Sequence, residues 1–228
     1  MIKTQDLRQR VPVFDGSLDI LKGINLEIKR GDSVAIVGSS GSGKSTLLGM
    51  LAGLDLPSSG KVLLDETDIT RLDEEARAKV RARLVAFVFQ NFQLLGSLTA
   101  LENVMLPLEV NNHPAPLQQA KNYLEKVGLA ERERHYPRQL SGGEQQRVAL
   151  ARAFASEAPI LFADEPTGNL DAETGKNIAD LLFELNQETE TTLVLVTHDK
   201  TLADRCNKQF KMTAGELEAV QASGSVAH

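Results

Sequence analysis

The chain has 228 residues, of which 42% are hydrophobic, and this is enough for one domain with a buried core and a subdomain. No apolar stretch reaches the ~18 residues of a membrane-spanning helix, and the N-terminal residues lack the apolar core of a signal peptide. The net charge of -6 and the lack of tryptophan argue against a nucleic-acid surface, and Cys206, the only cysteine, excludes an internal disulfide and fits a reducing cytosol.

The opening third of the sequence predicts strands. Residues 21–28 alternate apolar and polar side chains, as in a half-buried strand. Residues 34–37 (V-A-I-V) form a continuous apolar run, which is typical of a strand buried on both faces. Further strands are predicted over residues 61–65 and 85–89.

A glycine-rich segment, G-x-x-x-x-G-K-S, follows the apolar run directly, and a helix is predicted from it to about Leu51, with Gly53 as its cap. Backbone N–H groups of such a turn surround phosphates, Lys44 adds a positive charge at the β- and γ-oxygens, and the Ser45 hydroxyl ligates Mg²⁺. We therefore expect a nucleoside triphosphate to bind here. The expected binding residues are Gly38, Ser39, Ser40, Gly41, Ser42, Gly43, Lys44, Ser45 and Thr46.

Helical periodicity replaces the strand signal in the middle of the chain. Thr99 and Glu102 have the spacing of a capping box, and Pro107 is expected to limit the helix that they begin. Two more helices are predicted over residues 117–127 and 144–155.

The segment L-S-G-G-E-Q-Q-R, residues 140–147, is a second glycine-rich turn that opens a helix. The Ser141 hydroxyl and the N–H groups of Gly142 and Gly143 can bind a phosphate. Because two glycines are a costly helix start, we expect phosphate binding here rather than plain helix capping by Ser141. One chain therefore has two predicted phosphate-binding surfaces.

Residues 160–163 predict a buried strand that ends in two carboxylates, Asp164 and Glu165. In a chain that has a glycine-rich phosphate-binding loop (P-loop), an acid at the carboxyl end of a strand is placed to hold Mg²⁺. We assign this role to Asp164. Glu165 is expected to accept a proton from the water that attacks the γ-phosphate. An amphipathic helix over 173–188 and a buried strand over 193–196 follow.

These motifs, together with G-N-L-D at residues 168–171 and T-H-D at 197–199, resemble the ATP-binding-cassette ATPases over essentially the whole chain. In that family two cassettes pair head to tail, and each ATP lies between two glycine-rich segments. One copy contributes the phosphate-binding loop, or P-loop, which corresponds to residues 38–45 here, and the other contributes the signature turn, which corresponds to residues 140–147. The resemblance therefore implies a homodimer in which Ser141 and Gly143 act on the γ-phosphate of the ATP bound by the other copy.

The resemblance also assigns roles to single residues. Gln90 matches the Q-loop residue that reaches Mg²⁺ and the attacking water, Asp171 matches the D-loop residue at the dimer seam, and His198 matches the switch histidine that contacts the γ-phosphate. The family usually stacks an aromatic ring on adenine. In this chain the corresponding position is Val11, with Phe14 as the alternative.

The predicted elements and the resemblance together imply an α/β fold: a P-loop NTPase core with an N-terminal antiparallel β subdomain and an inserted α-helical subdomain. We expect residues 1–90 and 159–220 to form the core with the β subdomain. Residues 91–158 are then the helical subdomain that carries the signature turn, and residues 221–228 are a flexible tail.

Three segments, at residues 87–90, 98–104 and 163–171, are similar to the small ATPases of MacB- and LolCDE-type membrane complexes. This similarity implies ATP and Mg²⁺ as cofactors, no nucleic-acid partner, and an integral permease of MacB/FtsX type that holds the protein at the cytoplasmic face of the membrane. ATP-driven closure would then power a mechanical stroke that extrudes or releases lipoprotein or hydrophobic cargo. A signalling subunit of a cell-division-type complex, with no cargo, stays open as the alternative.

Two related classes of ATPase fit the sequence less well. A chromosome- or repair-type ATPase would have a long coiled coil between Lys44 and Ser141, and a translation-type ATPase would have two cassettes in one chain. The apolar side chains of residues 91–95, directly after Gln90, are either part of the core of the insert or a docking groove for a short cytoplasmic helix of the permease.

Overall fold

The computed structural model describes residues 1–14 and 16–220, so the predicted tail at 221–228 lies outside the described residues. The chain divides into two units. Unit 1 comprises Met1–Leu84 and Thr192–His228, and unit 2 comprises Val85–Thr191. Among the described helices, none is long and apolar enough to span a membrane.

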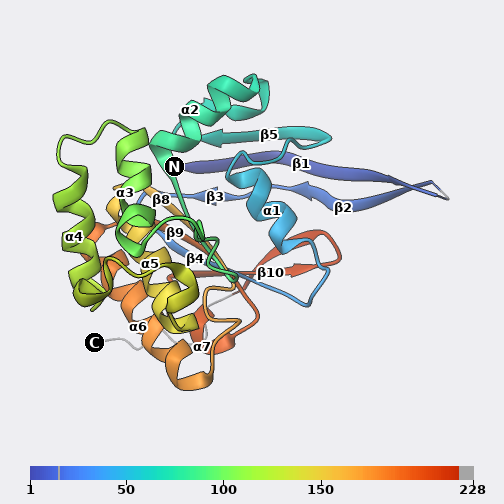
Figure 1. The fold of residues 1–228 in the computed structure, drawn as a ribbon. Helices are drawn as coiled ribbons and strands as arrows, with labels where there is room; N and C mark the ends of the chain where they lie inside the picture. The colour runs from blue at the N-terminus through green and yellow to red at the C-terminus, as the bar shows by residue number, and fades with distance from the viewer. Residues whose placement is uncertain (15, 221–228) are drawn as a thin grey trace, which may run out of the picture. The chain divides into compact units, whose positions relative to one another are not determined.

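An antiparallel sheet of strand order β2-β1-β5-β6, with β3 paired to β1, occupies much of unit 1. In Figure 1, β1 and β2 continue together as a long hairpin. Thr4 fixes the start of this sheet, since its hydroxyl donates to the carbonyl of Ile24 and accepts from the N–H of Leu26. The strands are β1 (Ile2–Val13), β2 (Gly16–Ile24), β3 (Glu27–Ile28), β5 (Ser59–Leu64) and β6 (Thr67–Asp68).

Unit 1 also has parallel strands, in which β4 lies between β9 and β10, and β11 pairs antiparallel with β10. The strands β4 and β9 are buried almost throughout, as their continuous apolar sequences predict. The elements are β4 (Ser33–Val37), β9 (Thr192–Thr197), β10 (Lys208–Thr213), β11 (Glu216–Val220), α1 (Lys44–Leu51), η1 (Ile69–Arg71), α2 (Glu74–Leu84) and α7 (Lys200–Ala203).

Unit 2 combines two parallel strands, β7 and β8, with four helices. Helix α5 is central, because it packs against α3, α4, α6 and β7. The fully buried ring of Phe162 stacks on Phe87 with 5.8 Å between the ring centroids, and this joins the two strands. The elements are β7 (Val85–Phe89), α3 (Ala100–Val110), α4 (Pro116–Lys126), η2 (Ala130–Arg132), η3 (Pro137–Gln139), α5 (Gly142–Ala155), β8 (Ile160–Asp164) and α6 (Ala172–Thr189).

The prediction that Pro107 limits its helix was wrong, because α3 continues through Pro107 to Val110. The proline removes one backbone hydrogen bond inside the helix, at a cost of about 3 kcal/mol. Val104 and Leu108 on either side are buried, and each such side chain contributes about 2 kcal/mol. Packing of this face on α4 and α5 therefore keeps the helix intact. The capping box of Thr99 and Glu102 at its start is confirmed.

Candidate active site

In unit 1, the glycine-rich loop and His198 leave the sheet at the same edge. Val37, the last residue of β4, is in register with Thr197, the last residue of β9, and the two strands are parallel. The residues that follow, Gly38 and His198, therefore emerge from neighbouring carboxyl ends, where ligands of α/β sheets bind. The structure thus brings together two of the motifs in which the sequence predicted chemistry.

The loop after β4 has room for its backbone only because of its glycines. A Cβ at Gly38 would lie 2.4 Å from the carbonyl oxygen of Met212 and 2.8 Å from the Ser42 Oγ. Gly43 has a φ of 104°, in the left-handed region, and a Cβ there would lie 3.1 Å from the carbonyl oxygen of Ile20. The loop is therefore held tightly on one side by β2 and β10 of unit 1.

Helix α1 begins directly after this loop and has a bare N-terminus. Its N-cap, Gly43, has no side chain to accept a hydrogen bond, and no acidic residue lies in the first turn. By contrast, side chains cap α3, α5 and α6. The first-turn N–H groups of α1, which include those of Ser45 and Thr46, thus keep the partial positive charge of the helix end, and this favours an anion.

Lys44 is the first residue of α1, and its side chain reaches back to the loop. The residue is only 9% exposed, and its ammonium group donates to the carbonyl oxygens of Gly38, at 2.8 Å, and Ser39, at 3.0 Å. The buried Ser42 Oγ, in the same loop, has no hydrogen-bond partner among the described residues. A cation, an orphaned hydroxyl and a bare helix end fit the phosphates of a nucleotide.

In unit 2, Gln90 and the two acids also share a sheet edge. Phe89, the last residue of β7, is in register with Asp164 of the parallel strand β8, so Gln90 and Glu165 emerge side by side. The Gln90 Nε2 donates to the Asn169 Oδ1 at 2.9 Å, and the Asn169 Nδ2 donates to the Gln90 carbonyl at 3.0 Å. Asn169 was not predicted as a site residue, although it lies in the G-N-L-D motif.

Glu165 has a φ of 45°, which is uncommon for a residue with a side chain. Such backbone strain is concentrated at functional sites, where surrounding contacts hold the residue in place. One such contact is the N–H of Gly168, which donates to the Glu165 carbonyl at 3.0 Å. Asp164 is half-buried one residue earlier.

The acids at this strand end are few for a metal site. Among the described residues, no group of three or more His, Cys, Asp or Glu side chains forms a metal cage. Mg²⁺ in phosphate-transferring sites uses only one or two carboxylates and completes its shell with waters and substrate phosphates. One half-buried aspartate at a strand end therefore fits this ion.

The signature turn departs from the expectation in one respect. Ser141 is the N-cap of α5: its Oγ accepts from the Glu144 N–H at 3.2 Å, and the Glu144 carboxylate accepts from the Ser141 N–H at 2.8 Å. The prediction that the glycines disfavour a capping role was therefore wrong. The cap uses one lone pair of the Ser141 hydroxyl oxygen, and the hydroxyl also hydrogen-bonds the Glu144 carboxylate, so it must turn away from Glu144 to donate to a phosphate.

The two glycines of the signature turn differ in their surroundings. A Cβ at Gly143 would lie 2.6 Å from the Thr174 Cγ2, so close packing of α5 on α6 requires glycine there. At Gly142 the nearest atoms, from Leu170 and Phe92, would be 3.4 and 3.6 Å away, which is ordinary contact. Only Gly143 is thus needed for packing within this chain.

Glu144 makes this turn sensitive to acid. The N–H and hydroxyl of Ser141, and the guanidinium of Arg132 at 3.2 Å, hold the Glu144 pKa below its ordinary value of 4.5. The capping box therefore stabilises the fold fully above pH 4.5, and this contribution is lost as the pH falls through the lowered pKa.

We predict that Glu144→Gln, which keeps a capping-box side chain, removes this pH dependence. The free energy of unfolding, measured in urea, should fall in both proteins between about pH 5.5 and about pH 3. The fall should be about 1 kcal/mol smaller in the variant than in the wild type. Glu125→Gln, on the exposed side of α4, is the matched control and should follow the wild type. An unchanged pH dependence in Glu144→Gln would contradict the role of the box.

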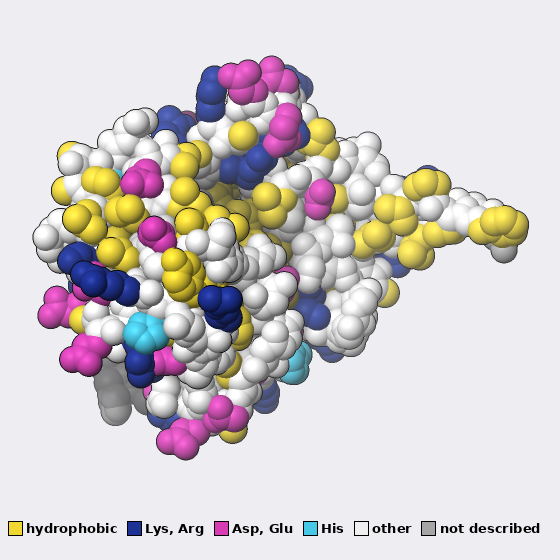
Figure 2. All heavy atoms as spheres, in the orientation of Figure 1, with side chains coloured by type: hydrophobic (Ala, Val, Ile, Leu, Met, Phe, Trp, Pro, Cys, Tyr) yellow, Lys and Arg dark blue, Asp and Glu magenta, His cyan; other side chains and the backbone are white. Residues whose placement is uncertain are grey.

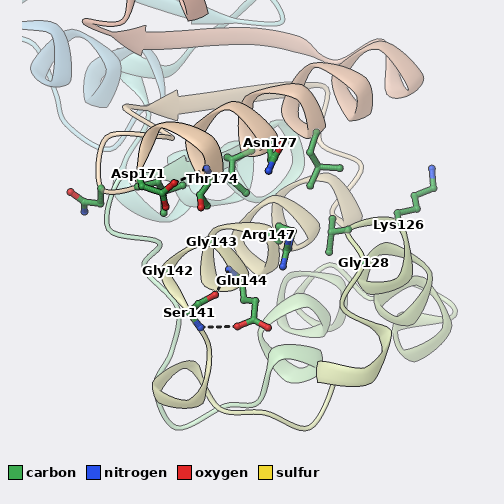
Figure 3. A pocket seen from close by; sticks show the side chains of 15 residues that line it. Lys126, Gly128, Ser141, Gly142, Gly143, Glu144, Arg147, Asp171, Thr174 and Asn177 are labelled. Atoms are coloured by element: carbon green, nitrogen blue, oxygen red, sulfur yellow. Dashed lines mark hydrogen bonds between the residues drawn. The ribbon is translucent and has the colours of Figure 1, made fainter.

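A cavity of about 620 Å³ lies beside the signature turn, between the end of α4 and the first turns of α5 and α6 (Figure 3). Ser141, Arg147 and Asp171 are among its lining residues. The Arg147 Nε is buried and has no hydrogen-bond partner among the described residues. Asp171 caps α6 by accepting from the Thr174 N–H at 3.0 Å, and hydrogen bonds from Thr174 lower its pKa. The cavity is therefore lined by the signature turn and by the guanidinium of Arg147, a site residue that was not predicted from the sequence.

The two residues considered for the nucleotide base lie on the hairpin of β1 and β2. Val11 is half-buried and pairs with Leu18 across the hairpin. Phe14, which follows the last residue of β1, is 104% exposed, so the structure gives its ring no surface to pack on. Figure 2 shows hydrophobic side chains gathered along this projecting hairpin.

Comparison with known proteins identifies the family. Residues 21–168, more than half of the chain, match the family model described as ABC transporter. The chain is 53% identical over 220 residues to the ABC transporter ATP-binding protein YbbA of Escherichia coli (strain K12), with 96% of each chain covered. It is 45% identical over 222 residues to the lipoprotein-releasing system ATP-binding protein LolD of Pseudomonas fluorescens, covering 96% of this chain and 98% of that relative.

The solved structures agree with the sequence comparison. A dimeric, post-hydrolysis state of the ATP-binding cassette MJ0796 bound to ADP and Pi matches with a TM-score of 0.90 and 39% sequence identity, over 98% of this chain and 100% of that one. The predicted P-loop α/β fold is thereby confirmed. Residues 73–79 and the E-Q-Q of the signature turn predict a resemblance to YbbA, and the 53% identity to that protein confirms it. The chain therefore belongs to the ABC transporter family, in the branch that contains YbbA and LolD, and is an ATP-binding-cassette ATPase.

Proposed function

We propose that this ATPase is the nucleotide-binding subunit of a membrane complex and that two copies close on ATP to drive a mechanical stroke. The stroke acts on a permease of MacB/FtsX type, which holds the protein at the cytoplasmic face of the membrane and extrudes or releases lipoprotein or hydrophobic cargo. The similarity to LolD, named for a lipoprotein-releasing system, supports the cargo class, and the dimer of MJ0796 supports the pairing.

The main observation behind this proposal is that a single chain has two glycine-rich helix N-termini. The α1 end carries Lys44 and has no side-chain cap, and the α5 end carries the Ser141 hydroxyl beside a cavity. Two copies related by a two-fold axis would use both surfaces twice and form two equal sites. In each site, one copy's P-loop would hold the phosphates, and the other copy's signature turn would close on the γ-phosphate.

The proposed binding roles follow from this pairing. Lys44 neutralises the β- and γ-oxygens, and the loop N–H groups surround the phosphates. Asp171 lies at the dimer seam, His198 contacts the γ-phosphate, and Val11 contacts the base. The full set of nucleotide-binding residues is Val11, Gly38, Ser39, Ser40, Gly41, Ser42, Gly43, Lys44, Ser45, Thr46, Ser141, Gly142, Gly143 and Asp171.

The proposed chemistry depends on Glu165, Gln90 and His198. Glu165 accepts a proton from the attacking water, and Gln90 orients that water while Asn169 holds the Gln90 amide. Ser45, Gln90 and Asp164 are assigned to Mg²⁺. When bound, this ion neutralises the charge that develops on the phosphate oxygens.

We further propose that the permease docks on residues 91–95. Leu95 is 48% exposed, and α3 and α4 of the same unit carry three more exposed apolar residues: Leu106, Val110 and Leu117. The alternative is that residues 91–95 belong only to the core of the insert. The exposure of Leu95 argues against this alternative, while the partial burial of Leu94 and Phe92 agrees with it.

The test is co-purification of the tagged protein from detergent-solubilised membranes. The wild type should elute with a polytopic membrane protein in stoichiometric amount, and Leu95→Asp should lose at least about 90% of it, because a desolvated charge at an apolar contact costs several kcal/mol. Leu56→Asp is the matched control, since Leu56 is 47% exposed in unit 1. Equal recovery with both variants would refute docking at this loop, and no membrane protein with the wild type would refute the complex.

A further inference from the structure

The segment after Gln90 has an unusual backbone. Phe92 and Gln93 have φ angles of 61° and 47°, so two consecutive residues with side chains are left-handed. Single residues visit this region occasionally, and for residues other than Gly, Asn and Asp it is unfavourable. The turn is tight, since the N–H of Phe92 donates to the Phe89 carbonyl at 3.1 Å and that of Gln93 to the Asn91 carbonyl at 2.6 Å. A contact from outside the segment is therefore needed to stabilise this backbone conformation.

The guanidinium of Arg152, on α5, makes this contact. Its Nη1 donates to the Gln93 carbonyl at 2.7 Å, and its Nη2 donates to the Phe92 carbonyl at 3.2 Å. Burial lowers the pKa of Arg152 below its ordinary value, so placing the charge here has a cost that the two carbonyls offset. The group stays protonated at neutral pH.

The geometry explains why the left-handed residues and the arginine occur together. In an extended strand successive carbonyls point in opposite directions, whereas in this turn, with its positive φ angles at Phe92 and Gln93, the two carbonyls both face one guanidinium. Only the second arrangement presents two oxygens to the planar fork of one guanidinium. A lysine ammonium is a single point charge on a flexible stem and does not match this fork.

Helix α5 connects this contact to the signature turn. Ser141 caps its N-terminus, and the fully buried Gln146 donates from its Nε2 to the carbonyl of Pro166, which follows Glu165, at 2.6 Å. Arg152 lies 11 residues after the cap, a helical rise of about 16 Å. The ring of Phe92 lies 3.6 Å from where a Cβ of Gly142 would be, so the left-handed segment also touches the start of α5.

We propose that Arg152 is a positioning residue, which holds the left-handed turn after Gln90 and makes Gln90 follow the movement of the signature helix. This inference rests on the proposed function, in which the signature turn closes on ATP and Gln90 orients the attacking water. Within one subunit, the Arg152 side chain would then link closure of the signature turn to the placement of Gln90.

The test compares steady-state ATP hydrolysis by the full-length wild type and by Arg152→Lys. We expect kcat to fall by about tenfold to about 100-fold while KM for ATP changes by less than about threefold, because the loop that carries Gln90 is misplaced and the phosphate-binding loop is intact. A second substitution, Gln93→Gly, should restore most of the lost kcat in the Arg152→Lys background, since glycine adopts the left-handed conformation without support. If Arg152 only stabilised the fold, Gln93→Gly would not restore kcat in Arg152→Lys.

The controls separate the turn from general effects. Asn112→Gly, at another left-handed residue (φ 55°), should not rescue Arg152→Lys, and Arg83→Lys, on the exposed side of α2, should behave as the wild type. If Arg152→Lys does not fold, Gln93→Val in the wild-type background replaces it. A β-branched residue disfavours the left-handed turn, and kcat should again fall by about tenfold.

Three results would decide against the inference: a normal kcat in Arg152→Lys, a normal kcat in Gln93→Val, or a loss in Arg152→Lys that Gln93→Gly does not restore. A wild type without ATP hydrolysis would instead refute the proposed function. The two failures are thus distinguishable in one set of assays.

Discussion

Glu165→Gln is expected to lower kcat for ATP hydrolysis by about 1,000-fold or more and to leave the affinity for ATP nearly unchanged. The amide has the size of the carboxylate but cannot take a proton, and a positioned general base contributes about 10²- to 10⁴-fold. Because ATP would bind and not turn over, the two copies should stay closed on it. Size-exclusion chromatography with ATP should then show a dimer, and the wild type should return to monomer as ATP is consumed.

Two further variants make this result specific. Glu173→Gln, an exposed acid in the first turn of α6, is the matched control and should hydrolyse ATP normally. Adding Ser141→Ala to Glu165→Gln should abolish the dimer and leave ATP binding by the monomer nearly intact, since Ser141 is assigned to the ATP held by the other copy. Normal hydrolysis by Glu165→Gln would show that Glu165 is not the base.

The parallel strands β4, β7, β8 and β9 were predictable because they are short and continuously apolar. The prediction of a strand over residues 85–89 matches β7, and the helix predicted from the glycine-rich segment to about Leu51 matches α1. Parallel strands that are buried on both faces leave little ambiguity in the sequence. The order of motifs then places chemistry at strand ends, and the register of β4 with β9 and of β7 with β8 agrees with this.

What the sequence did not show depends on packing and on long-range contacts. Helix α2 was not predicted: it is mostly polar, and it is held in part by Arg81, which donates to the carbonyl of Gly53 at 2.6 Å. Arg152 and Gln93 are separated by 59 residues, and nothing in the spacing of either predicts their hydrogen bond. The same is true of Gln90 and Asn169, 79 residues apart. Local propensity cannot report such pairs.

Lys44→Ala is expected to act on binding itself, unlike Glu165→Gln. The ammonium lies inside the loop and already donates to two loop carbonyls, so it can meet phosphate oxygens without rearranging the helix that follows. A hydrogen bond to a charged group contributes about 1.5–3 kcal/mol, and Kd for ATP should therefore rise by about 10- to 100-fold, as measured by titration calorimetry. Lys29→Ala, at an exposed turn before β4, is the matched control.

The same change can be followed without any hydrolysis, through the stability that ATP confers on the fold. At an ATP concentration of about 100 times the wild-type Kd, ligand binding should stabilise the wild type by about 2.7 kcal/mol. If Kd rises 100-fold, as at the upper end of the expected range, the same concentration should stabilise Lys44→Ala by only about 0.4 kcal/mol. The variants must be compared without nucleotide as well, because Lys44 also supports its own loop. Equal stabilisation of both proteins by ATP would mean that the glycine-rich loop does not hold the phosphates, and the assignment of the whole site would then fail, including the role of Glu165.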